Sequence, residues 1–224
     1  MSGKRIIAPG DAQSLNFREI CMGSIAPGTL YRSSHPIQDN KQEKIIAFLA
    51  ARARIAAVIN LSDTNSELRT KVFFAPWYNK LYRDNQVITL GMDFNYSSEE
   101  FRKKLNKCLR FIISTNGPWL IHCHAGVDRT GYVSIILEAL MGTSMDEIVN
   151  DYLQSFNSVF DSSIYSAANK KDSIVVMQLL SVMGNYLAIN DNNLQAIAEH
   201  YMRNTIGLRA EEVELLKRKL AESI

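Results

Sequence analysis

The stretch 119-WLIHCHAGVDRTGYV-133 carries the strongest local signal for the fold. It opens with an apolar run, typical of a buried strand, that leads directly into His122 and Cys123. From about Arg129 to Met141 the sequence is helical in character, and Gly142 marks the end of that helix. The stretch therefore predicts a central strand, a polar loop and a helix, which is the repeating unit of α/β proteins.

The remaining sequence alternates strands and helices and then becomes helical. We expect strands within 28–36, 55–61 and 86–92, and helices at 40–53, 98–113, 144–156, 172–183, 191–204 and 210–222. Residues 66–80 are ambiguous and fit a short helix broken near Pro76. The expected fold class is α/β, with a central, mostly parallel sheet flanked by helices and a helical C-terminal elaboration. We expect one domain over 1–224, in which 157–190 is either a helical lid or additional core.

Composition excludes several classes of protein. The chain has 224 residues, of which 46% are hydrophobic, as in an ordinary globular protein. Its formal charge is only +2, so we expect no nucleic-acid partner. Three scattered cysteines are too few for a disulfide framework or a zinc site, which favours a reducing compartment. The sequence predicts neither a signal peptide nor an integral membrane segment. We therefore expect a cytoplasmic protein, although secretion without a signal would leave no trace.

The residues around Cys123 suit phosphate chemistry. A loop between a strand and a helix N-terminus directs amides and the helix dipole at an anion, which also favours a thiolate. Gly126 lets the backbone approach a ligand without a Cβ clash. Arg129 offers a planar fork that can bind two phosphate oxygens. The hydroxyl of Thr130 can hydrogen-bond the sulfur of Cys123 and help it to leave when a phosphocysteine is hydrolysed. A lone cysteine on a strand is usually a core residue, but this full set predicts a nucleophile above an anion site.

The pattern of a histidine, a cysteine, five residues, an arginine and a threonine resembles the signature of cysteine-dependent phosphatases of the protein tyrosine phosphatase superfamily. The resemblance implies a cysteine nucleophile at Cys123 and a phosphate-gripping side chain at Arg129. It implies that His122 orders the loop and tunes the cysteine rather than acting as a base. The substrate-binding loop would then comprise His124, Ala125, Gly126, Val127, Thr130 and Gly131.

Phosphoryl transfer to sulfur requires a general acid, and two aspartates are candidates. Asp93 follows the strand expected at 86–92, and its placement is similar to the acid loop of compact dual-specificity phosphatases. Asp128 lies inside the loop beside Arg129, a position where myotubularin-type and some bacterial phosphatases carry an acid. A nearby phosphate would raise the pKa of either carboxyl, which suits an acid. Both candidates stay open, with a slight preference for Asp93.

Other segments resemble a bacterial tyrosine phosphatase family with an NFRD element and a GKDRTG loop. The corresponding stretches here are LNFREI (15–20), GTLYRSSHP (28–36), AVINLSD (57–63), EIVNDYLQSF (147–156) and RNTIGLRAEEVELLKRKL (203–220). Arg32 in the second stretch is a candidate for supporting the site. Cys21 and Met22 replace expected glycines, and Asn60 and Ser62 replace charged residues.

The departure that bears most on substrate is Val127, where such enzymes carry a lysine associated with phosphoinositide preference. The loss of this lysine removes a cation that could bind a second phosphate. His124 would compensate in part if it were protonated. We expect a phosphomonoester phosphatase working through a phosphocysteine, most simply a tyrosine or dual-specificity phosphatase, with no metal or cofactor. Its partners would be phosphorylated proteins, small molecules or lipids. The alternatives are a phosphoinositide or inositol-phosphate phosphatase, a non-catalytic phospho-ligand module and a sulfurtransferase.

Overall fold

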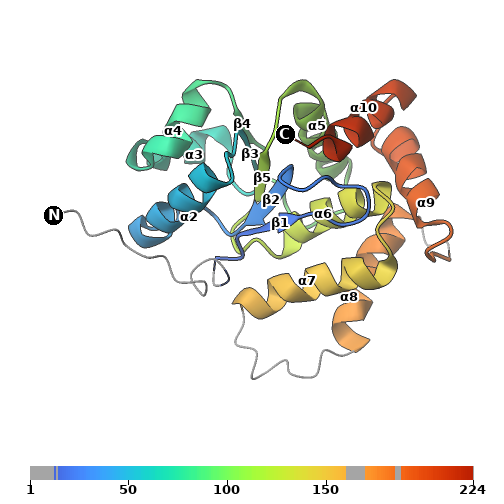
Figure 1. The fold of residues 1–224 in the computed structure, drawn as a ribbon. Helices are drawn as coiled ribbons and strands as arrows, with labels where there is room; N and C mark the ends of the chain where they lie inside the picture. The colour runs from blue at the N-terminus through green and yellow to red at the C-terminus, as the bar shows by residue number, and fades with distance from the viewer. Residues whose placement is uncertain (1–12, 14, 160–169, 185–187, 224) are drawn as a thin grey trace.

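A computed structural model describes residues 13, 15–159, 170–184 and 188–223 (Figure 1). The strands among these residues are β1 Arg18–Ile20, β2 Leu30–Ser33, β3 Ala57–Asn60, β4 Val87–Thr89 and β5 Trp119–His122. The α-helices are α2 Asn40–Arg52, α3 Asn65–Lys71, α4 Pro76–Arg83, α5 Glu99–Ser114, α6 Asp128–Leu140, α7 Met145–Val159, α8 Lys170–Met183, α9 Leu194–His200 and α10 Ala210–Ala221. A 3-10 helix, η1 Val72–Phe74, and a π-helix, η2 Tyr201–Thr205, complete the elements.

The strands form one sheet in the order β1-β2-β5-β3-β4, in which only β1 runs antiparallel to its neighbour. The α/β fold with a mostly parallel sheet is therefore confirmed. His122 at the end of β5 lies opposite Ser33 of β2 and Asn60 of β3. Because parallel strands end at the same edge, the loops that follow these strands meet there, at the usual ligand edge of an α/β sheet.

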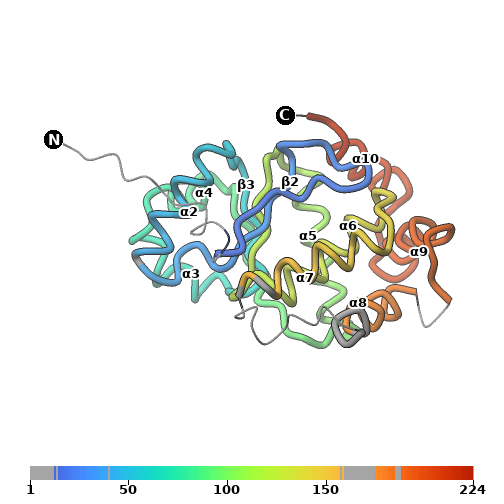
Figure 2. The backbone as a smooth tube through the Cα atoms, turned by 60° about the horizontal axis from the view of Figure 1, so that its bottom comes forward, coloured from blue at the N-terminus to red at the C-terminus, as the bar shows by residue number. Residues whose placement is uncertain are grey.

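Alternate residues of the central strands face two apolar cores. Val58 and Leu120 pack in the core covered by α2, α3 and α4. Their neighbours Ile59 and Ile121 pack in the larger core with α5 and α6. Figure 2 shows α2 and α4 on one side of the sheet and α5 and α6 on the other. The strand period of two thus explains why both faces of the sheet are covered.

Helix α6, which directly follows the loop at Cys123, is enclosed by other elements. Every residue from Thr130 to Leu140 is buried. The helix packs against β5, α7, α8 and α9. A helix that is apolar all round belongs in a protein interior, and this position holds its N-terminus in a fixed place beneath the loop.

The structure refines several expectations about local elements. Pro76 does not interrupt a helix but begins α4, where its missing N–H costs no hydrogen bond. The strand β1 was not expected, because three residues are too few for a visible alternation. The stretch 157–190 lies partly outside the described residues. Within it, α8 packs on α6 and α7 with Val176 and Leu180 fully buried.

Candidate active site

Cys123 begins the loop between β5 and α6, and its side chain is buried. The backbone amides of residues 124–130 donate to no carbonyl or side chain among the described residues. Amides at a strand-to-helix turn that are free in this way, together with the positive end of the helix dipole, form an anion-binding cradle. The local backbone therefore provides the donors that a phosphate group requires.

The carbonyls of the same loop are bonded to the surrounding scaffold. The oxygen of His124 accepts from the backbone N–H of His35 at 2.9 Å. The oxygen of Gly126 accepts from Nδ2 of Asn16 and from Nη2 of Arg32, each at 2.9 Å. The C=O and the N–H of a trans peptide point in opposite directions. Holding these carbonyls toward the surrounding scaffold therefore leaves the amides free to point at a ligand.

Gly126 is required by both its conformation and its surroundings. Its φ is +75°, in the left-handed region that favours glycine. A Cβ built at this position would lie 2.5 Å from the carbonyl oxygen of Ser33. The loop therefore lies directly against the end of β2, and no larger residue fits without moving the backbone.

Arg129 is held beside the loop with part of its guanidinium unused. Its Nη1 donates to the carbonyl of Met92 at 2.9 Å, and its guanidinium carbon lies 4.7 Å from the centre of the Phe94 ring. Its Nε is buried and has no partner among the described residues. The buried hydroxyl of Thr130 also lacks a partner in the described part of the chain. Buried donors without acceptors at a helix N-terminus indicate a polar ligand.

Comparison with known proteins agrees with this geometry. A sequence model of a tyrosine phosphatase family matches residues 13–222. The chain belongs to this family. The triple specificity protein phosphatase PtpB of Mycobacterium tuberculosis is 49% identical over 79 residues, which are 34% of this chain and 28% of PtpB. A Cupriavidus necator protein, provisionally named a tyrosine-protein phosphatase, is 32% identical over 97 residues, 39% of this chain and 34% of that protein.

The chain thus spans about a third of the length of the curated relatives it matches. Among solved structures, the core catalytic domain of the PP-IP phosphatase SIW14 from S. cerevisiae is 22% identical, with a TM-score of 0.45. That alignment covers 78% of this chain and 96% of the yeast domain.

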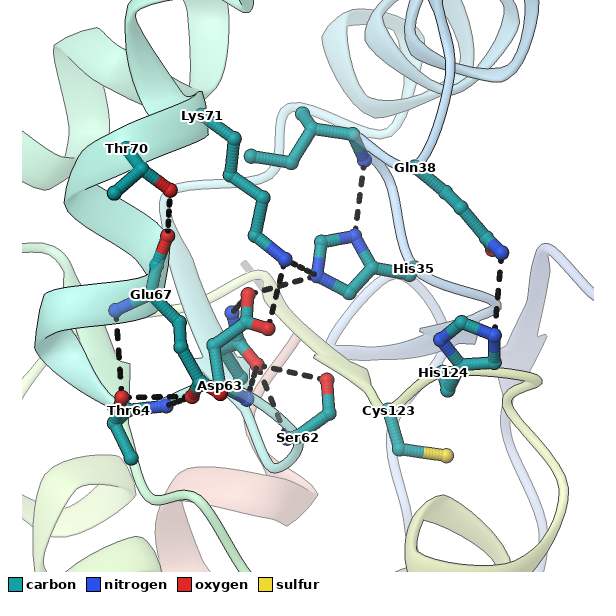
Figure 3. Close-up of polar contacts among 12 residues, drawn as sticks. His35, Gln38, Ser62, Asp63, Thr64, Glu67, Thr70, Lys71, Cys123 and His124 are labelled. Atoms are coloured by element: carbon teal, nitrogen blue, oxygen red, sulfur yellow. Dashed lines mark hydrogen bonds and ion pairs between the residues drawn. The ribbon is translucent and has the colours of Figure 1, made fainter.

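The remaining loop residues of this tyrosine phosphatase family member differ in their surroundings. His124 is exposed, and its Nε2 lies 3.2 Å from the side-chain amide of Gln38 (Figure 3). Ala125 is half-buried, whereas Val127 is buried in the larger apolar core. Gly131 lies against the ring of Tyr152, and a Cβ there would come within 2.9 Å of it. The loop therefore presents backbone rather than charged side chains to a ligand.

His122 is buried behind the loop and is uncharged. Its Nδ1 lies 3.4 Å from the carbonyl of Cys123, which can only accept, so the ring proton belongs on Nδ1. Its Nε2 then accepts from the hydroxyl of Tyr78 at 2.8 Å. Burial lowers the pKa of His122 well below its usual range, which agrees with a neutral ring. The ring also contacts that of His35 edge-on, with 4.9 Å between their centres.

His35, whose ring contacts that of His122, belongs to a polar cluster with Asp63 and Lys71 of α3 (Figure 3). Asp63 bonds Nε2 of His35 and Nζ of Lys71, each at 2.8 Å. Burial opposes ionisation of Asp63, but these bonds hold its pKa below its usual range. The backbone N–H of Ile37 donates to Nδ1 of His35, so the other ring nitrogen carries the proton toward Asp63. The cluster fixes His35, whose backbone in turn holds the loop.

Arg32 and Asp151 form the buried support of the loop on the opposite side. Arg32 has no exposed surface, and its Nη1 is paired with Asp151 of α7 while its Nη2 reaches Gly126. Arg18 of β1 bonds the same carboxylate at 2.7 Å and also bonds the side chain of Asn16. A single carboxylate therefore positions both side chains that hold the Gly126 carbonyl.

Glu138 of α6 is a fourth ionisable residue in this network. Burial and the nearby Asp151 raise the pKa of Glu138 well above its usual range, which favours its neutral form. Burial opposes ionisation of Asp151, but Arg32 and Arg18 lower its pKa, so it stays ionised. With Glu138 in its neutral form, two arginines and one carboxylate leave a net positive charge behind the loop, which favours an anionic ligand.

Sequence reasoning missed Asn16, Arg18 and Asp151. The first two belong to the LNFREI stretch, and the third belongs to EIVNDYLQSF. Their presence in stretches that resemble a phosphatase family was the available signal. Nothing in the local pattern linked an arginine near the N-terminus to an aspartate 133 residues later.

The two candidate acids occupy different elements. Asp93 is exposed on the loop after β4, and its Oδ1 accepts from the backbone N–H of Asn95 at 2.9 Å. Asp128 is exposed at the first residue of α6. The pKa of Tyr96 is raised mainly by burial, then by the charge of Asp128, and Cys123 contributes in the same direction. The loop with Asp93 and Tyr96 therefore lies near both Cys123 and Asp128.

All three cysteines are free thiols, and burial raises the pKa of Cys108 to about 12.

The described residues contain no group of three or more His, Cys, Asp or Glu side chains arranged to hold a metal ion. In the same part of the chain, no helix combines the length and hydropathy needed to cross a membrane.

We predict that Gly126→Ala abolishes phosphate binding, because the new Cβ must displace either the backbone of Ser33 and Ser34 or the loop itself. Gly28→Ala is the matched control, since Gly28 also has a positive φ of +80° but no atom lies within 4 Å of its Cβ position. Gly28→Ala should lower the free energy of unfolding by about 1–3 kcal/mol and leave phosphate binding intact. Equal phosphate affinities of the two variants in calorimetry would contradict this account of the loop.

Proposed function

We propose that this chain is a phosphomonoester phosphatase that acts through a phosphocysteine intermediate. The observation that carries the proposal is the loop after β5, in which free amides surround the position of Cys123 while the carbonyls are bonded away from it. Family membership supports the same chemistry.

In the first step the Cys123 thiolate attacks phosphorus in line, and the bond from phosphorus to the leaving oxygen breaks. The loop amides and the free Nε edge of Arg129 stabilise the equatorial oxygens of the transition state. In the second step water attacks phosphorus and gives a proton to the carboxylate that served as the acid, the sulfur–phosphorus bond breaks and inorganic phosphate leaves. Thr130 donates its hydroxyl proton in a hydrogen bond to the departing sulfur, which lowers the cost of restoring the thiolate.

Asp93 is the proposed acid for the first step. Its loop is tied to the phosphate-binding arginine, because the carbonyl of Met92 and the ring of Phe94 both contact Arg129. Asp93 lies between these two residues in the sequence, and this supports its assignment as the acid for a leaving group whose phosphate Arg129 holds. Asp128, on α6, is the competing assignment.

The proposed substrate is a phosphotyrosine side chain. Phe94 is 60% exposed beside Arg129, so its ring offers an aromatic surface next to the bound phosphate. The cations near the loop do not favour a second phosphate. Lys71 is paired with Asp63, and Val127 replaces the lysine expected for inositol lipids. Neither position therefore offers an unpaired cation for the additional phosphates of a polyphosphorylated inositol, whereas a single aryl phosphate needs only the loop and Arg129.

Cys123→Ser should lower the rate of p-nitrophenyl phosphate hydrolysis by several orders of magnitude, because a serine hydroxyl is not ionised at neutral pH. Binding of tungstate, an inert phosphate analogue, should persist because the amides and Arg129 remain. Tungstate affinity measured by calorimetry is the control for folding of the variant. A wild-type chain that binds tungstate but hydrolyses no phosphomonoester would instead be a binding module.

Asp93→Asn should slow hydrolysis of phenyl phosphate by about 100–10,000-fold, since the leaving phenoxide needs a proton. The effect should shrink for 2,4-dinitrophenyl phosphate, whose leaving group departs without protonation. Asp128→Asn is the matched variant and should show no such dependence on the leaving group. The opposite pattern in kcat would assign the acid to Asp128 and refute the role of Asp93.

Phe94→Ala should lower kcat/KM for a phosphotyrosine peptide by about tenfold, the value of one aromatic contact. Hydrolysis of the matching phosphoserine peptide should be nearly unchanged, because its leaving group has no ring. Phe74, 77% exposed on η1, provides the control substitution Phe74→Ala. If Phe94→Ala affected both peptides equally, phosphotyrosine selectivity would not depend on this ring.

A further inference from the structure

A cavity of about 700 Å³ lies between α5, α8, α9 and η2, apart from the loop at Cys123. Figure 2 shows α8 and α9 close together on the side of the molecule away from α2 and α4. Small-molecule sites commonly have volumes of ~300–1,000 Å³. The cavity is therefore large enough for a ligand, and the proposed phosphatase mechanism does not use it.

The cavity combines an apolar wall with two nitrogen donors. Val182, Met183 and Ile197 form the apolar part, whereas Arg102 and His200 provide the polar part. No aspartate or glutamate is among the lining residues. This mixture suits a molecule that has an apolar body and one negative charge.

Arg102 is a cation on the cavity wall that forms no ion pair with a described residue. No carboxylate in the described part of the chain forms an ion pair with it, whereas the neighbouring Lys103 is paired with Glu99 at 2.7 Å. The side chain of Arg102 is close enough to Tyr201 for its charge to lower the pKa of that buried hydroxyl, against the larger effect of burial. Arg102 therefore carries its charge at the cavity wall without a direct ion pair, although that charge also helps to lower the pKa of Glu99.

His200 offers a second donor. The side-chain amide of Asn204 lies 3.0 Å from Nδ1 of His200 and can only donate, so the ring proton is on Nε2. His200 is followed directly by the π-helix η2, whose Tyr201 and Thr205 also line the cavity. Single π-turns inside helices occur often at functional sites.

We propose that this cavity binds a small amphipathic anion, an acyl carboxylate, with the carboxylate at Arg102 and His200 and the acyl chain against Val182, Met183 and Ile197. The site is separate from the phosphate cradle but lies next to the acid loop, because Tyr96 forms part of its wall. The inference does not depend on phosphatase activity.

The test is calorimetric titration of the full chain with decanoate in saturating inorganic phosphate. One decanoate should bind per chain, and the uncharged 1-decanol should bind at least about tenfold more weakly, the loss expected for a charged hydrogen bond. Arg102→Gln should weaken decanoate binding by about tenfold or more. Lys103→Gln is the matched control on the same helix and should bind as the wild type does.

A second variant tests the cavity without removing a charge. Ala196 is exposed and lines the cavity, so Ala196→Phe fills space without disturbing the core and should abolish decanoate binding. The proposal is overturned if wild-type binding does not saturate at one decanoate, if phosphate displaces decanoate, or if the Arg102 and Lys103 variants bind equally. Retained binding by the Ala196 variant would also overturn it.

Discussion

The hydrogen bonds to the carbonyls of His124 and Gly126 are the constraint on which the candidate site depends. A short loop has enough freedom to turn its carbonyls inward, and inward-facing carbonyl oxygens would repel an anionic ligand. Donors from Asn16, Arg32 and His35 remove that freedom, and each donor comes from outside the loop. The anion-binding character of the loop is thus imposed by the surrounding structure as much as by its own sequence.

Parallel strand register brings these outside donors into place. The segments after β2, β3 and β5 emerge at one edge of the sheet because Ser33, Asn60 and His122 are in register. His35 lies in the segment after β2, Asp63 lies in the segment after β3, and the loop at Cys123 is the segment after β5. The sheet therefore acts as the rigid part, and the polar clusters on each side fix the orientation of the loop upon it.

Much of this could be predicted from the sequence where the signal is local. The apolar run before His122, the buried helix after Arg129 and the amphipathic helix that begins after Ser98 each have a period or cap that short windows contain. The support of the loop could not be predicted in that way. Arg18 and Asp151 meet only after the sheet and α7 have packed, and no local pattern encodes a pairing over 133 residues. The choice between Asp93 and Asp128 likewise depends on how two loops approach each other.

The shared carboxylate of Asp151 also has a consequence for synthesis of the chain. The loop at Cys123 leaves the ribosome before α7 does, and until Asp151 has emerged the arginines behind the loop lack their common partner. Burying two arginines without a carboxylate partner costs free energy, so packing of the loop against β1 and β2 is unfavourable before α7 is present. A nascent chain that ends before α7 thus carries the complete signature around Cys123 without the geometry to use it.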